Sequence, residues 1–223
     1  MTRRPTTVLI ALAGLAWTAG QAILPDMALE TAERYDLVAA DRASEGWSGA
    51  LLVLAGVLLV LGALSLGRRL RTVAGSPGHR GVVVGTALLG LGGIWLAAGR
   101  GAFNLMFVRL TDPDVPRAAA LAVLDAPGDA SFAPLLLTLP CLLLGPIVLG
   151  VGLRRAVGAS WLPVVLWVVG IATFIASEFT VKVGEVAGIG LASVALVLLA
   201  LASERGAPVQ QARMPQESVR VAP

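Results

Sequence analysis

Six stretches of this chain run for 17 to 22 residues without a charged side chain. A membrane-spanning helix needs about 20 apolar residues, because a rise of about 1.5 Å per residue must cross a hydrocarbon core of about 30 Å. Spanning β-strands would alternate in polarity, and these stretches do not. The sequence therefore predicts an all-α fold, a polytopic transmembrane helical bundle with six spans. The expected spans are Val8–Leu24, Ser48–Gly67, Val82–Gly99, Phe132–Leu153, Trp161–Ser177 and Val186–Ala202.

Basic residues are unevenly distributed between the segments that connect these spans. One alternate set (residues 1–7, 68–81, 154–160 and 203–223) holds 11 basic and two acidic residues, whereas the other set holds six basic and 12 acidic residues. Lys and Arg accumulate on the cytoplasmic side of membranes. We therefore expect both termini in the cytoplasm and a location in the cell membrane, here a bacterial inner membrane. The net charge of +3 follows from this bias and gives no reason to expect nucleic-acid binding.

The first apolar stretch has an alternative interpretation as a cleaved secretory signal peptide. Met1–Pro5 is short and basic, Val8–Trp17 is apolar, and small residues follow, which is the signal-peptide pattern. Cleavage would leave five spans. We favour a retained helix, because the apolar run continues to Leu24 and Gln21 with Ala22 makes a poor cleavage context.

The connecting segments on the acidic side contain helical patterns of their own. We expect a short interfacial helix within Asp26–Glu45, a second Ala-rich helix at Val115–Ala126, and continuation of the third span to Arg109. Residues 1–202 would then form one domain. Residues 203–223, rich in Pro and scattered charge, are expected to be a disordered cytoplasmic tail.

Arg100 lies at the outer end of the third span, between Gly99 and Gly101, and Asn104 follows four positions later on the same helical face. Arg100 could bind an anion or a lipid headgroup at the outer mouth of the third span. Alternatively it could be structural, reaching water or pairing with an outer carboxylate. We favour the structural role, because arginines near the ends of spans commonly extend to the interface.

Three prolines, Pro134, Pro140 and Pro146, mark the fourth span. Each removes a backbone donor and bends the helix, which either opens a binding site or fits the helix around its neighbours. If any span lines a cavity, we expect it to be this one. A continuous polar lining, with Thr138, Thr173 and Asn104, would indicate transport, whereas a closed and dry bundle would indicate a binding role.

Several enzyme classes need residues that this chain lacks. Its single cysteine, Cys141, forms no intrachain disulfide, and its single histidine, His79, lies in a cytoplasmic segment. Lys182 is expected in a loop between Glu178 and Glu185, and the outer carboxylates match no calcium-binding loop. We therefore expect no catalytic residues, no metal site and no cofactor. Small residues four apart, such as Gly81 with Gly85, are expected to pack helices within the chain.

Two stretches resemble one another and a known group of proteins. Leu51–Arg71 is a Leu- and Gly-rich run containing Arg68-Arg69, and Leu135–Arg155 likewise ends in Arg154-Arg155. Six spans, acidic segments before the second and fourth, and an arginine pair after each resemble a group of small membrane proteins of GC-rich bacteria whose domain has no known function. The resemblance implies a six-span architecture and no particular activity.

The sequence therefore favours a non-enzymatic membrane protein that binds a partner or lipid, as an accessory protein. Its expected partners are membrane lipids and either another protein or a second copy of the chain. A passive small-solute transporter or conduit around the fourth span is the first alternative. A lipid-modifying enzyme that uses outer carboxylates is the second.

Overall fold

The computed structural model describes residues 5–25, 30–70, 76–125, 136–177 and 181–211. These residues form helices without a β-strand among them, which confirms the all-α prediction. Five helical segments are long and apolar enough to cross a membrane, and one further apolar helix is shorter. The five are α1 (Pro5–Ile23), α3 (Arg42–Leu70), the continuous helix of α4 (His79–Ile94), η2 (Trp95–Gly101) and α5 (Ala102–Leu110), α8 (Thr138–Val157), and α10 (Lys182–Gln211); the shorter one is α9 (Leu162–Ser177).

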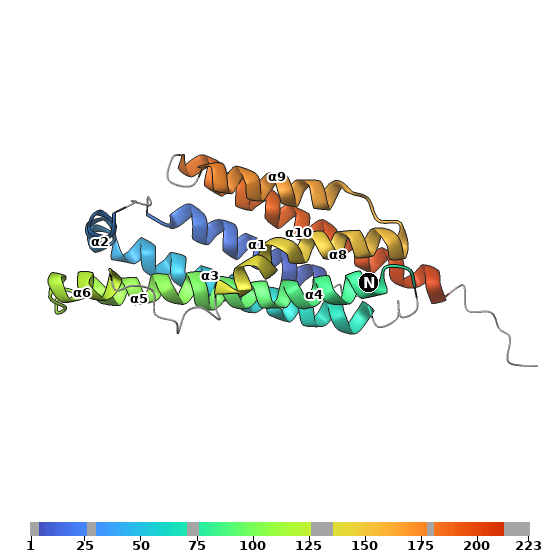
Figure 1. Cartoon of the computed structure of the whole chain (residues 1–223), viewed down its shortest axis with the longest axis horizontal. Coiled ribbons are helices and arrows are strands. Elements are labelled where there is room, and N and C mark those ends of the chain that lie inside the picture. Colours follow the sequence, from blue (N-terminus) through green and yellow to red (C-terminus); the bar gives the residue numbers. More distant parts are fainter. Residues whose placement is uncertain (1–4, 26–29, 71–75, 126–135, 178–180, 212–223) are drawn as a thin grey trace, which may run out of the picture.

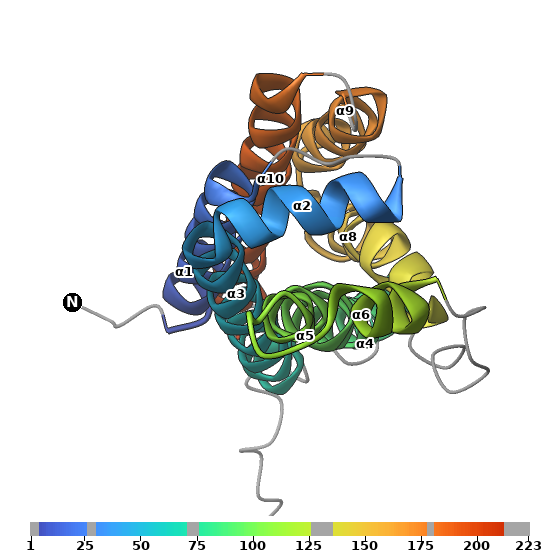
Figure 2. The same cartoon turned by 90° about the vertical axis from the view of Figure 1, so that its left-hand side faces the viewer.

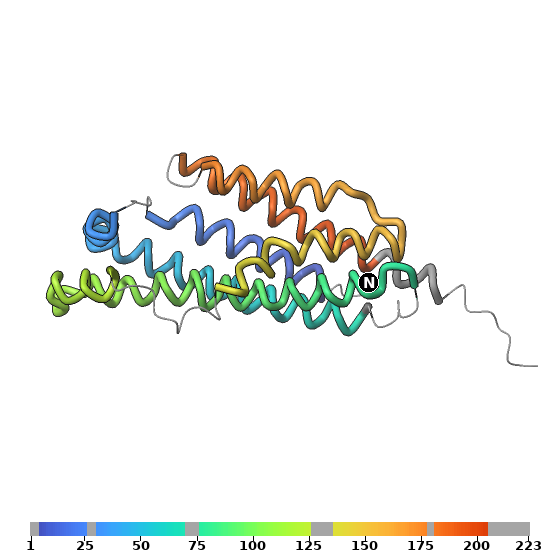
Figure 3. The backbone as a smooth tube through the Cα atoms, in the orientation of Figure 1, coloured from blue at the N-terminus to red at the C-terminus, as the bar shows by residue number. Residues whose placement is uncertain are grey.

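The six apolar segments run side by side along the long axis of the molecule (Figure 1). Viewed from the end, helices in contact follow one another in the order α9, α10, α1, α3, α4 and α8, and α8 touches α9 again (Figure 2). The start of α1 and the end of α10 lie at the same end of the bundle (Figure 3). We call the opposite end, which is covered by α2 (Thr31–Ala40), the α2 end.

Apolar side chains cover the outside of the bundle as well as its core. Within the five long segments, only 39% to 50% of each apolar window is buried. Large side chains such as Leu15, Leu64 and Val165 are more than half exposed along the sides of the bundle. A soluble protein rarely exposes so large an apolar surface, so this belt supports an embedded position in a membrane.

Helices α4 and α8 pack through glycines that allow their backbones to touch. A Cβ atom on Gly92 would lie 2.5 Å from the Cα atom of Leu142, and one on Gly85 would overlap the backbone of Leu149. On the other side of the seam, a Cβ atom on Gly145 would lie 2.8 Å from the amide nitrogen of Leu89. Small residues permit such close approach between membrane helices. The expected packing of small residues within the chain is therefore confirmed on this seam.

Pro146 lies inside α8, and a backbone carbonyl in the turn before it accepts a hydrogen bond from a tryptophan of the next helix. Proline has no N–H to donate and its ring pushes the preceding turn open. The indole N–H of Trp167 donates a 2.9 Å hydrogen bond to the carbonyl oxygen of Leu143, three residues before Pro146. Pro140 lies in the first turn of α8, and Pro134 lies outside the described residues.

Two short helices at the α2 end confirm the expected helical patterns. Helix α2 lies across the end of the bundle, and α6 (Arg117–Leu124) follows Pro116 (Figure 2). Tyr35 and Val38 of α2 pack with Phe107 of α5 in a small apolar cluster separate from the main core. Arg117 binds Asp36 across this cluster at 2.9 Å.

Several helix ends differ from the expected spans. Helix α3 begins at Arg42 rather than Ser48, and α10 begins at Lys182, which we had placed in a loop. The third helix continues through η2 and α5 to Leu110, which confirms the expected continuation. Helix α10 also runs past Ala202 to Gln211, so helix replaces the first part of the expected tail, and residues 212–223 lie outside the described residues.

Candidate functional site

A π-helix interrupts the long third helix between Trp95 and Gly101. The N–H of Ala102 donates to the carbonyl of Ala97, five residues earlier, instead of four. Short π-helical insertions are frequent at functional sites, because the wider turn changes which side chains share a face. The ring of Trp95 packs so closely over Gly99 that a Cβ atom there would lie 2.5 Å from it.

Beside this π-helix lies a cavity of about 220 Å³. Five apolar segments contribute to it, and the lining is mainly aromatic and branched aliphatic. One lining residue, Ile175 of α9, is 57% exposed at the bundle surface. We call it the Arg100 cavity, and its lining is Trp17, Gln21, Trp95, Leu96, Arg100, Leu139, Leu142, Leu143, Ile171, Phe174, Ile175 and Ile189.

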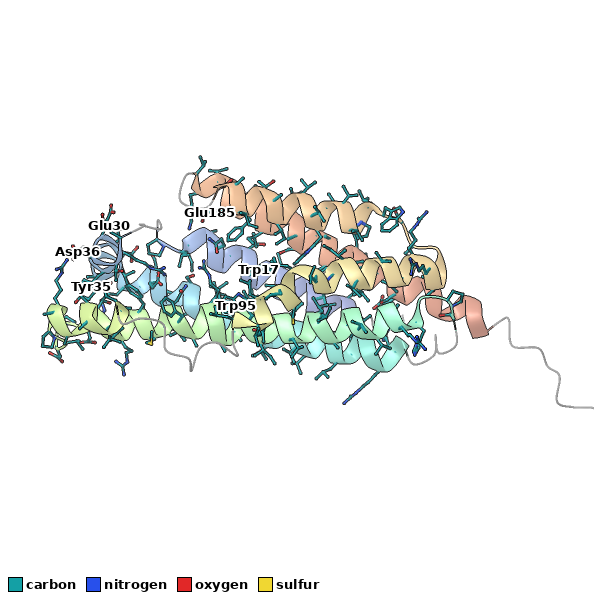
Figure 4. All side chains as sticks on the ribbon, in the orientation of Figure 1. Trp17, Glu30, Tyr35, Asp36, Trp95 and Glu185 are labelled. Carbon is teal, nitrogen blue, oxygen red and sulfur yellow. The ribbon has the colours of Figure 1, made fainter. Side chains whose placement is uncertain are left out.

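Two polar side chains, Gln21 and Arg100, line the Arg100 cavity. Helix α1 runs toward the α2 end, and along it Gln21 lies beyond Trp17. In η2, which runs the same way, Arg100 lies beyond Trp95. Figure 4 shows Trp17 and Trp95 in the half of the bundle nearer α2, with Glu185 farther toward that end. On these two helices the polar lining residue therefore lies on the α2 side of the tryptophan, while α8 and α9 place apolar lining residues, Leu139 and Ile175, toward the same end.

Immediately beyond the cavity, a buried polar contact joins α1 to α10. Gln21 donates a 2.8 Å hydrogen bond from Nε2 to Oε2 of Glu185, and both side chains are almost fully buried. Lys182 lies one turn from Glu185, with its Nζ atom 3.5 Å from the same oxygen. The carboxylate of Glu185 thus has one hydrogen-bond donor, Gln21, and one positive charge, Lys182, beside it.

A second buried carboxylate, Glu45 of α3, lies at the same level. Its side chain is only 1% exposed and lies 3.6 Å from the guanidinium of Arg34 in α2. The charges of Arg100 and Lys182 also act on Glu45. The guanidinium of Arg34 further lies over the ring of Phe107, 4.9 Å from its centroid. Charged groups from α2, α3, η2 and α10 therefore form one layer, which we call the outer charge cluster: Arg34, Glu45, Arg100, Lys182 and Glu185.

Of the polar residues considered in the sequence analysis, Arg100 lines the cavity and the others do not. Arg100 lines the cavity and acts electrostatically on Glu45, whereas Asn104 is fully buried and donates a long, 3.5 Å hydrogen bond to Ser48. Neither Asn104, Thr138 nor Thr173 lines the Arg100 cavity.

The sequence analysis also considered the fourth span, Cys141 and Glu178. Helix α8, the expected fourth span, does line the cavity through Leu139, Leu142 and Leu143, as predicted. The thiol of Cys141 donates to the carbonyl of Leu137 at 3.5 Å. Glu178 lies outside the described residues.

Sequence reasoning missed two buried carboxylates and the amide that binds one of them. The sequence analysis places Glu45 in an interfacial segment and Glu185 beside a loop, because the predicted spans exclude charged residues. Both belong to helices that extend beyond the apolar windows. Gln21 was weighed only as part of a cleavage context. The sequence signal that could have identified Gln21 as a buried polar residue is its position one helical turn after Trp17, on a mainly apolar helix.

The opposite end of the bundle has an open hollow of about 400 Å³ around the start of α4. Its lining includes His79 with Arg80 and Arg155. In the part of the chain that the structure describes, no three His, Cys, Asp or Glu side chains are grouped to hold a metal ion.

Compared with protein-family models, with curated proteins and with solved structures, the chain matches none of them. Its function must therefore be argued from the geometry of its own residues, above all from the Arg100 cavity and the outer charge cluster.

Proposed function

We propose that this chain is a six-span cell-membrane protein that binds a membrane lipid in the Arg100 cavity, as a non-enzymatic accessory protein. The observation that carries the proposal is the cavity itself, which is lined mainly by apolar side chains, among them Ile175 at the bundle surface. Ligand sites are typically apolar hollows with a few well-placed polar groups. An acyl chain that enters from the surrounding membrane matches this lining.

A passive conduit is supported less well. A path for small polar solutes needs hydrogen-bonding groups along its length, whereas ten of the twelve described residues that line the Arg100 cavity are aliphatic or aromatic. Thr138, Thr173 and Asn104, which would have extended a polar path, are not lining residues.

The proposed topology has both termini in the cytoplasm and the α2 end outside. It is supported by the uneven distribution of basic residues and by the position of the start of α1 and the end of α10 at one end of the bundle. Helix α9 has 16 residues and rises about 24 Å. This is slightly less than a hydrocarbon core of about 30 Å, a mismatch that bilayers absorb by local thinning.

Reporter fusions test this topology. Fusions at Gly75 and Pro223 should report a cytoplasmic position, and a fusion at Asp114 an external one. An external signal at Pro223 would refute the six-span arrangement. We also propose that the first helix is retained, because α1 packs against α3 and α10 and supplies two lining residues. An intact-mass measurement that located the mature start near Gln21 would contradict this.

Filling the cavity tests lipid binding. Leu143→Trp should reduce the amount of co-purifying lipid seen by native mass spectrometry, because the larger side chain occupies the space beside Phe174. Leu144→Trp is the matched control, since Leu144 is 51% exposed and lies outside the lining. Equal lipid retention by both variants would contradict the proposal. Solute flux in proteoliposomes that Leu143→Trp abolishes would favour the conduit.

A further inference from the structure

The hollow around the start of α4 is lined by arginines from two different helices. Arg80 lies in the first turn of α4 and Arg155 in the last turn of α8, both at the end of the bundle away from α2 (Figure 1). We call this hollow of about 400 Å³ the basic hollow. The described residues that line it, among which there is no carboxylate, are Ser76, Gly78, His79, Arg80, Gly81 and Arg155.

The positive charge of the basic hollow is not neutralised by the part of the chain that the structure describes. Neither Arg80 nor Arg155 forms an ion pair with a described carboxylate. At this end of the bundle the described acidic residue is Glu204, and it lies 3.6 Å from Arg69 instead. A hollow lined by charge of one sign concentrates ions of the opposite sign. Its electrostatics therefore favour an anion.

The neighbouring arginine of α8 has a different environment. Arg154 donates a 3.1 Å hydrogen bond to the carbonyl oxygen of Ala159, and its guanidinium lies 5.1 Å from the centroid of the Trp161 ring. Arg154 therefore packs on the segment that leads to α9, and it is not a lining residue of the basic hollow. Arg155, the next residue of the helix, lines the hollow instead. The two arginines at the end of α8 thus have separate roles.

Close contact between backbones fixes Arg80 and Arg155 relative to one another. Gly78, just before α4, has a φ of 98°, in the left-handed region that favours glycine. A Cβ atom there would lie 2.7 Å from the Cβ atom of Arg155, and one on Gly81 would lie 3.1 Å from the Cα atom of Gly152. The start of α4 and the end of α8 therefore form a firm base for the hollow. The first N–H groups of a helix have no partner within the helix, so this turn also supplies backbone donors.

We infer that the basic hollow binds a phosphate group between the guanidinium groups of Arg80 and Arg155. The planar fork of N–H donors on each arginine matches the oxygens of a phosphate. A volume of about 400 Å³ corresponds to roughly 13 water molecules at about 30 Å³ each, so a phosphate fits together with bridging water. A lipid headgroup and a free phosphate ion share this chemistry. Binding here is independent of the function proposed for the Arg100 cavity, which lies elsewhere in the bundle.

Two sets of probes distinguish these sources of phosphate. The full chain in an uncharged detergent would be titrated with dioleoyl phosphatidic acid and with dioleoyl phosphatidylcholine, in which choline neutralises the phosphate charge, and followed by native mass spectrometry. For a headgroup, phosphatidic acid should bind about tenfold more tightly, a difference equivalent to about 1.4 kcal/mol. Inorganic phosphate would be added at constant ionic strength. For a free phosphate, it should raise the melting temperature while the two lipids bind alike.

Variants of the two arginines assign the effect to the basic hollow. Arg80→Gln and Arg155→Gln should each reduce the phosphate-dependent effect, and the double variant should abolish it. Both side chains are exposed, so stability without ligand should change little. Arg68→Gln is the matched control, because it removes the same charge from an exposed position at the same end of the bundle, outside the lining. Leu143→Trp, which fills the Arg100 cavity, should leave the effect unchanged.

Four outcomes would refute phosphate binding in the basic hollow. The first is that neither phosphatidic acid nor inorganic phosphate has an effect. The second is that the double variant keeps the effect, and the third is that Arg68→Gln loses as much of it as Arg80→Gln, which would show a response to net charge alone. The fourth is loss of the effect in Leu143→Trp, which would place the lipid in the Arg100 cavity. Should the double variant melt earlier without ligand, the single variants decide, and unchanged binding by both refutes the site.

Discussion

Gln21 and Glu185 are separated by 164 positions in the chain, yet their side chains meet in a buried hydrogen bond of 2.8 Å. This contact joins the first long helix to the last one beside the Arg100 cavity, which Gln21 lines. Since Gln21 is 2% and Glu185 4% exposed, neither side chain can replace its partner with bulk water. The pair therefore helps to fix the position of the helix that carries Trp17.

We predict that Gln21→Leu lowers the free energy of unfolding by about 1–3 kcal/mol, because it removes the hydrogen-bond donor of the buried Glu185 carboxylate. The double variant Gln21→Leu with Glu185→Leu should cost less than the sum of the two single variants, since it removes both partners. Unfolding in mixed micelles, followed by circular dichroism, measures these values. Strictly additive losses would show that the hydrogen bond does not couple the helices.

A second prediction concerns the bond between the indole of Trp167 and the carbonyl of Leu143. Trp167→Phe keeps an aromatic ring beside Trp17 but removes the donor, so it should destabilise the protein by about 1–3 kcal/mol. In a Pro146→Ala background the same change should cost less. Alanine permits a regular helix, in which the N–H of Ile147 satisfies the Leu143 carbonyl. If Trp167→Phe costs the same in both backgrounds, the indole does not compensate for the proline.

The helices of this fold were predictable from the sequence, because the length of an uncharged run reports directly on the thickness of a membrane. The ends of the helices were not. Glu45 and Glu185 continue their helices toward α2, and hydropathy cannot recognise a charge that is buried by partners from other helices. The sequence records that Arg34 and Lys182 exist, but not that α2 folds back over the bundle to bring Arg34 to Glu45.

The candidate site could be predicted only in part. The fourth span was expected to line a cavity and α8 does so, but four other segments line it equally and none of its prolines is a lining residue. The π-helix that positions Arg100 depends on one extra residue in a turn, and no composition signal distinguishes it from a regular helix. The residues Trp17, Trp95 and Phe174 meet only after five segments pack, so their grouping is a property of the tertiary structure.

A third prediction follows from the salt bridge between Arg42 and Asp112, 2.8 Å long, beyond the end of α5. The backbone N–H of Asp114, and then the guanidinium of Arg42, hold the pKa of Asp112 below its ordinary value of 3.8. A lowered pKa means that the folded state favours the charged carboxylate. The resulting stability is present above pH 3.8 and is lost as the pH falls through the lowered pKa.

The Asp112→Asn variant tests this dependence. It should melt at a lower temperature than the unmodified protein at about pH 7, and the difference should shrink as the pH is lowered to about 3. The Arg42→Gln variant should reduce the difference at neutral pH, because it removes one of the two groups that favour the charged form. A gap in melting temperature that stays constant across this range would contradict the assignment.

The last prediction uses two glycines of α4 that lie two residues apart. A Cβ atom on Gly92 would lie 2.5 Å from the Cα atom of Leu142 in α8, whereas one on Gly90 would lie 3.6 Å from Ala63 in α3, an ordinary contact. Gly92→Ala should therefore destabilise the protein by about 1–3 kcal/mol, because the two backbones must separate. Gly90→Ala should be neutral or stabilise by up to about 1 kcal/mol, because alanine restricts the unfolded chain without a clash. Since Leu142 also lines the Arg100 cavity, Gly92→Ala should in addition weaken lipid retention, and Gly90→Ala should not. Equal stability of the two variants would show that close packing of α4 on α8 does not hold this wall of the cavity in place.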